Sequence, residues 1–89
     1  MKQYTTSEQT VKLIRLGFKE PRLLYFGNII IGQYSYTIGE LIEILDNQGI
    51  EIKNFGYWIV NHEWYTSTKD ELIDALYDTI ITLKEKGKL

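Results

Sequence analysis

Few residues of this chain could carry out chemistry. It has 89 residues, with one histidine and no cysteine. His62 is followed by Glu63 in a predicted strand, and because neighbouring strand residues point to opposite faces, the two side chains form no local acid–base pair. Asp74 and Asp78 lie four residues apart on a predicted helix, which suits a shared metal ion, but no third ligand can be identified. The sequence therefore predicts no catalytic residue and no metal site.

Sequence motifs that bind phosphates or cofactors are also missing. Glycine-rich dinucleotide, Walker and His-Glu-x-x-His patterns do not occur. The segment from Gly27 to Gly32 has two glycines but lacks the Lys-Ser/Thr that follows them in a phosphate-binding loop. The absence of cysteine removes disulfides, thiolate nucleophiles and iron–sulfur clusters. We therefore expect a protein that is not an enzyme and that uses no cofactor.

The composition indicates one small domain that spans residues 1–89. Hydrophobic residues make up 44% of the chain and aromatic residues 13%, which is enough for a packed core and excludes intrinsic disorder. The one long charge-free stretch, Leu23 to Tyr34, is shorter than the roughly 20 apolar residues that a membrane-spanning helix needs. The N-terminal residues have no secretory signal pattern. We expect a cytoplasmic protein with no membrane partner.

Three segments have the apolar spacing of helices, namely Ser7 to Leu16, Ile38 to Leu45 and Lys69 to Lys86. A threonine that can form a capping box precedes each one, and the candidate pairs are Thr5–Glu8 or Thr6–Gln9, Thr37–Glu40 and Thr68–Glu71. In the first helix we expect Val11, Ile14 and Phe18 to face the core, with Leu13 and Leu16 beside that stripe. The core stripe of the last helix consists of Leu72, Ile73, Leu76, Ile80 and Leu83.

Two hairpins are predicted between the helices. The first joins Arg22–Phe26 to Ile29–Tyr34 through Gly27-Asn28, and the second joins Ile50–Lys53 to Tyr57–Tyr65 through Asn54-Phe55-Gly56. The resulting order, α-β-β-α-β-β-α, predicts an α+β two-layer sandwich in which helices cover one face of an antiparallel sheet.

The second hairpin also predicts which side chains share a face. Its three-residue loop would pair Lys53 with Tyr57, with Gly56 in the left-handed position. Ile52, Trp58 and Val60 then lie on the core face. We expect Trp58 beneath the last helix and Trp64 in a more exposed position.

Three blocks of sequence resemble a known group of proteins. The blocks are Tyr4–Thr10 with Leu16-Gly-Phe18, Tyr36–Leu45 and Glu71–Asp78. They resemble short uncharacterised proteins from phages and mobile elements of gut Bacteroidetes. All three blocks are helix starts, so the resemblance implies a mobile-element origin and a single domain. It implies no activity, no cofactor and no functional residue.

The last predicted helix carries a row of acidic side chains opposite its apolar stripe. The row consists of Glu71, Asp74, Asp78 and Glu85, and Glu40 and Glu43 of the second helix could extend it. A solvated face is the simpler explanation, because it balances the basic ends of the chain. The alternative is a surface that docks on a basic patch of another protein. We expect a small non-enzymatic protein-interaction module, whose partner the sequence does not identify.

Nucleic-acid binding is the second function that we consider. Residues 1–22 hold five basic and two acidic residues, and the candidate contacts on and after the first helix are Lys12, Arg15, Lys19 and Arg22. The pI of about 5.3 and the lack of a basic helix with base-reading side chains argue against this function.

The first hairpin raises the question of self-association. The side chains predicted on both of its faces are mostly apolar, and helices can cover only one face. Tyr25 and Ile30 lie on the second face, which a second copy of the chain could cover in a two-fold homodimer. Packing of the first helix, through Leu13 and Leu16, is the competing explanation.

Overall fold

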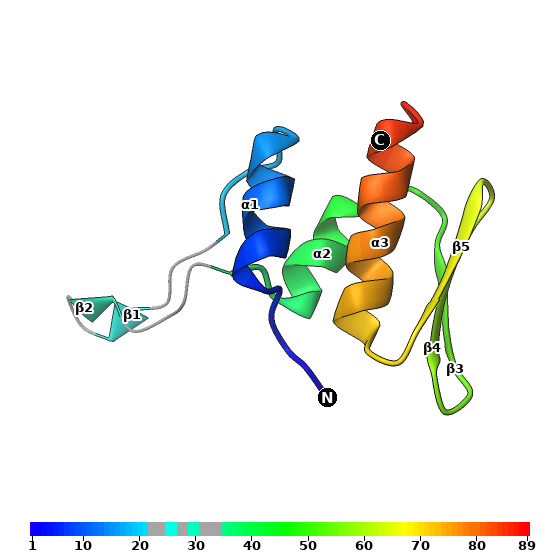
Figure 1. Ribbon diagram of the computed structural model, residues 1–89, viewed down its shortest axis with the longest axis horizontal. Coiled ribbons are helices and arrows are strands. Elements are labelled where there is room, and N and C mark those ends of the chain that lie inside the picture. The colour runs from blue at the N-terminus through cyan, green and yellow to red at the C-terminus, as the bar shows by residue number, and fades with distance from the viewer. Residues whose placement is uncertain (22–24, 27–28, 31–34) are drawn as a thin grey trace.

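The computed structural model describes residues 1–21 and 35–89, together with the backbone of residues 25–26 and 29–30. The elements in chain order are α1 (Ser7–Arg15), β1 (Tyr25–Phe26), β2 (Ile29–Ile30), α2 (Ile38–Ile44), β3 (Glu51–Asn54), β4 (Trp58–His62), β5 (Tyr65–Lys69) and α3 (Leu72–Glu85). Figure 1 shows α3 between the sheet β3–β4–β5 on one side and α1 and α2 on the other. No helix in the described ranges is long and apolar enough to cross a membrane.

The predicted α+β class is confirmed, but the predicted arrangement of elements is wrong. Apart from the two-residue pair β1–β2, which is separate from the main sheet, the order is α-α-β-β-β-α. The segment predicted as one strand, Tyr57 to Tyr65, forms β4 and the first residue of β5, because the chain reverses at Glu63 and Trp64. The backbone N–H of Trp64 donates to Nδ1 of His62 at 3.0 Å and stabilises this turn.

Helix α3 begins three residues later than predicted, at Leu72 instead of Lys69, because β5 extends to Lys69 and a bend at Asp70 and Glu71 separates it from the helix. Thr68 pairs with Ile59 in the sheet and does not cap the helix, and the N-cap Glu71 makes no side-chain capping bond. The β-branched and hydroxylic run from Tyr65 to Thr68 favours a strand, and this preference overrides the capping pattern. The predicted core stripe of α3 is fully confirmed as buried.

The other two capping boxes form as predicted. Thr6 and Gln9 exchange bonds at the start of α1, and Thr37 and Glu40 do so at the start of α2. At the end of α1, Gly17 has a φ of 94°, and the Phe18 N–H donates to the Leu13 carbonyl at 3.3 Å, as in a Schellman motif. These caps fix where both helices begin and where α1 ends.

The hairpin β3–β4 has the predicted faces but a shifted register. Ile52 pairs with Val60 and Lys53 with Ile59, so the three-residue loop consists of Phe55, Gly56 and Tyr57. A register shift of two residues leaves each side chain on its original face. Val60 is fully buried, Trp58 is half-buried against the core, and Trp64 is 53% exposed. The relative exposure of the two tryptophans is therefore as predicted.

Helix α1 uses a face that only partly matches the prediction: Ile14 and Phe18 pack against the core, as predicted, and Val11 does not. Leu13 and Thr10 are buried, whereas Val11 is 44% exposed. The Thr10 hydroxyl lies 2.7 Å from that of Thr5, which is also buried. Because this internal bond satisfies a polar residue inside the protein, the buried face includes a threonine that a purely apolar pattern omits.

Candidate functional site

The acidic row predicted on α3 is divided between internal contacts and solvent. Asp78 lies against β5, where its Oδ2 accepts hydrogen bonds from the Tyr65 hydroxyl at 2.6 Å and the Ser67 hydroxyl at 2.7 Å. Ser67 is buried. The bond to Asp78, with desolvation, raises the pKa of Tyr65 above its ordinary value of 10.0. Asp78 therefore joins α3 to the sheet.

The N-terminal segment uses the next two carboxylates of the row. Glu71 accepts a hydrogen bond from the backbone N–H of Lys2 at 2.8 Å, and Asp74 accepts one from the Lys2 ammonium at 3.1 Å and one from the Gln9 amide at 3.0 Å. Partial burial raises the pKa of Asp74, but the bonds from Gln9 and Lys2 outweigh it and hold this pKa below the ordinary value of 3.8. These two residues join α3 to α1 and to the residues before it.

Glu85 is the member of the row that lies exposed near the end of α3. Asp74 and Asp78, which have the spacing of a metal-binding pair, take different partners: Lys2 and Gln9 bond to Asp74, and Tyr65 and Ser67 bond to Asp78. Among residues 1–21 and 35–89, no group of three or more potential metal ligands comes together.

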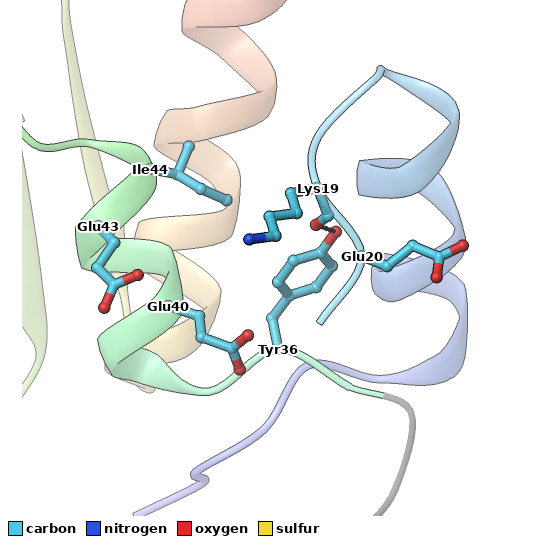
Figure 2. Close-up of a pocket in the computed structure, with 6 residues that line it drawn as sticks. All are labelled: Lys19, Glu20, Tyr36, Glu40, Glu43 and Ile44. Carbon is cyan, nitrogen blue, oxygen red and sulfur yellow. Dashed lines mark hydrogen bonds between the residues drawn. The ribbon is translucent and has the colours of Figure 1, made fainter. Parts of the chain in front are cut away.

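A charged hollow of about 210 Å³ lies between α2 and the segment after α1 (Figure 2). Its lining residues are Lys19, Glu20, Tyr36, Glu40, Glu43 and Ile44. The Tyr36 hydroxyl donates to the Lys19 carbonyl at 2.6 Å, and Glu40 bonds to the Thr37 N–H within the capping box. The hollow is smaller than the roughly 300 Å³ of typical ligand pockets, and its polar groups hold the two segments together.

The described basic residues that were predicted to contact nucleic acid border two different hollows. Lys12 and Arg15 lie exposed on α1, where they border an open groove that also contains Ser7 and Val11. Lys19 extends into the hollow beside α2 (Figure 2). Arg22 lies outside the described residues.

The two hairpin residues predicted to contact a second copy are paired with each other. Tyr25 lies opposite Ile30 in the antiparallel pair β1–β2. Their side chains fall outside the description, so the homodimer stays a prediction.

No family model, no curated protein and no solved structure matches the chain. Similarity therefore assigns neither a fold family nor an activity. The resemblance to phage and mobile-element proteins remains an expectation.

Sequence reasoning proposed neither of two groups of exposed aromatic residues as a binding site, although it predicted the greater exposure of Trp64. Phe55 and Tyr57, in the β3–β4 loop, are 65% and 43% exposed, and Trp64 lies in the β4–β5 turn. The loops lie at opposite ends of the sheet (Figure 1). A detectable signal existed for the first group, since two aromatic residues on either side of a turn glycine occupy positions where polar residues are usual. For Trp64 the missing information was the turn itself.

Proposed function

We propose that the chain is a small non-enzymatic protein-interaction module that docks through its β3–β4 loop. The observation that supports this proposal is the exposure of Phe55 and Tyr57 beside Gly56 in a three-residue loop. Large aromatic side chains supply much of the binding energy at protein interfaces when a partner buries them. The partner that fits is a protein with an apolar pocket.

The loop holds its aromatic residues in a defined position. The Gly56 N–H donates to the Asn54 side chain at 3.2 Å, and the Phe55 N–H donates to the Tyr57 carbonyl at 2.9 Å. Gly56 has a φ of 81°, which favours glycine over residues with a side chain. An ordered loop loses less conformational entropy on binding than a flexible one, which favours docking.

The acidic row supports the proposal less than the loop does. Glu71, Asp74 and Asp78 already accept hydrogen bonds from other parts of the protein, so a basic partner would have to compete with those bonds. The apolar hairpin of residues 23–34 remains a second proposed docking surface, tested by Ile30→Lys in a sedimentation experiment at micromolar concentration. A monomeric wild type would contradict the proposed homodimer.

The loop proposal is tested by affinity capture from cells that naturally contain the protein. We expect wild type to retain a partner that Phe55→Ser/Tyr57→Ser loses. The matched control is Val11→Ser/Ile42→Ser, which removes two exposed apolar side chains from α1 and α2. Both variants should remain folded, each with a loss of about 1 to 2 kcal/mol in the free energy of unfolding, because Val11, Ile42 and Tyr57 are only partly exposed. Retention of the same partner by the loop variant would contradict the proposal.

A further inference from the structure

Three lysines at the C-terminal end of α3 each lie over an aromatic ring. The distance from Nζ to the ring centre is 5.4 Å for Lys84 over Phe18, 5.5 Å for Lys86 over Tyr65 and 4.1 Å for Lys88 over Trp64. All three distances are within the range of cation–π attraction. The C-terminal ends of α1 and α3 and the β4–β5 turn lie on the same side of the molecule (Figure 1). The pairs at Tyr65 and Trp64 join the end of α3 to the β4–β5 turn in one basic and aromatic surface.

The most exposed part of this surface consists of Trp64, Lys86 and Lys88, which we name the lysine–tryptophan end. Trp64 is 53% exposed, and both lysines are exposed. Lys86 also donates to the Trp64 carbonyl at 3.4 Å, so two ammonium groups flank one turn. Stabilisation of the carbonyls at a helix C-terminus accounts for a basic residue such as Lys84 in the last turn. It does not account for Lys88, which follows Gly87 and lies beyond the helix.

We propose that the lysine–tryptophan end binds single-stranded nucleic acid. Backbone phosphates accept hydrogen bonds from the lysines, so the Lys88 ammonium leaves the Trp64 ring and an unpaired base stacks on the indole in its place. A peptide of acidic residues alone would match the lysines but offers no flat ring to the indole. A duplex keeps its base faces stacked inside. Single-stranded nucleic acid is the partner that uses both features of the surface.

The charge of the whole protein limits the strength of this binding. The formal net charge is −2, and the exposed acids Glu63 and Glu85 are neighbours in sequence of Trp64 and Lys86. Two phosphate contacts, one for each lysine, give a slope of about −1.4 for the logarithm of single-strand affinity against that of salt concentration. Affinity should therefore fall about sevenfold between about 50 mM and about 200 mM salt.

Fluorescence of Trp64 is the direct readout. The chain has two tryptophans, so Trp58→Phe leaves Trp64 as the single reporter. We expect oligothymidylate to quench this fluorescence, because a base stacks on the indole. Anisotropy of a labelled oligothymidylate with the wild-type chain measures the same affinity without the Trp58 substitution. Absence of binding by both methods at about 50 mM salt would overturn the proposal.

A matched pair of variants separates this site from a general effect of charge. Lys86→Glu/Lys88→Glu and Lys12→Glu/Arg15→Glu each replace two basic residues by two acids, the second pair on α1. We expect the first variant to lose at least tenfold in affinity and the second to lose less than threefold. Equal losses, or a larger loss for the α1 variant, would overturn the proposal.

Competition identifies the class of ligand. Unlabelled oligothymidylate should displace the labelled strand, whereas polyglutamate of the same length should not at equal concentration of charge. Equal displacement by polyglutamate would show a general preference for anionic chains and would overturn the assignment to nucleic acid.

Discussion

The region where α3 begins can be compared with the region where it ends, because three acids lie at the first and three lysines lie beside Glu85 at the second. Glu71, Asp74 and Asp78 accept hydrogen bonds from the N-terminal segment, α1 and β5. At the other end Lys86 and Lys88 are exposed and contact aromatic rings. Partly buried hydrogen bonds to charged groups stabilise a fold more than exposed cation–π contacts do. The acidic region therefore holds layers of the fold together, while the basic end remains accessible to a ligand.

The largest expected effect comes from Asp78. Asp78→Ala removes the acceptor of both the Tyr65 and the buried Ser67 hydroxyl, so we expect the free energy of unfolding to fall by about 2 to 3 kcal/mol. Urea denaturation measures this loss. Glu85→Ala, on the exposed part of the same helix, is the control and should change stability by less than about 0.5 kcal/mol. Similar losses of stability in the two variants would contradict the claim that Asp78 stabilises the fold and Glu85 does not.

The next largest effect is expected at Tyr65, which donates a hydrogen bond to Asp78. Tyr65→Phe removes one donor to Asp78 and should cost about 1 kcal/mol at neutral pH. Because the pKa of Tyr65 is raised in the folded state, its stabilisation is complete below pH 10.0 and is lost as the pH rises through the folded-state value. Wild type should therefore lose more stability than Tyr65→Phe above pH 10.0. Parallel stability curves on the alkaline side would contradict this account.

A smaller effect is expected where Lys2 meets α3. Asp74→Asn retains an oxygen for Gln9 but loses the charge opposite Lys2, at a cost of about 1 kcal/mol at pH 7. Because the pKa of Asp74 is lowered in the folded state, its stabilisation is present above pH 3.8 and is lost as the pH falls through the folded-state value. The variant should show a weaker decline of stability in acid than wild type. An unchanged acid dependence would argue against the Lys2 contact.

The smallest effect is expected at the basic end. Lys88→Ala removes the ammonium over Trp64, so the fluorescence of Trp64 should change while the free energy of unfolding falls by less than about 0.5 kcal/mol. A loss above about 1 kcal/mol would place this lysine among the residues that hold the fold together.

Much of the fold could be predicted because helix signals are local. Capping boxes at Thr6 and Thr37 and the apolar stripe of α3 depend only on residues within a few turns. The β4–β5 turn was missed because the residues at its tip, Glu63 and Trp64, include no glycine or proline. The turn is instead stabilised by the hydrogen bond from the Trp64 N–H to His62. One missed turn changed the strand count and delayed the start of α3.

The candidate site was harder to predict, because charge patterns do not show which partners are adjacent. The acidic row was recognised on the helix, but its bonds to Lys2, Gln9 and Ser67 join residues between 11 and 72 positions apart. The lysine–tryptophan end likewise depends on the turn that brings Trp64 to the end of α3. Long-range packing decides whether a charged residue stabilises the fold or remains exposed.

The central claim is that the acids at the start of α3 stabilise the fold and that the lysines at its end do not. Neutralising each group in a separate variant tests this claim most directly. One variant carries Glu71→Gln, Asp74→Asn and Asp78→Asn, and the other carries Lys84→Gln, Lys86→Gln and Lys88→Gln, so each loses three charges with little change of shape. Urea denaturation at neutral pH should show a loss of about 3 kcal/mol for the acidic variant and less than about 1 kcal/mol for the basic variant. Equal losses, or a greater loss for the basic variant, would contradict the account.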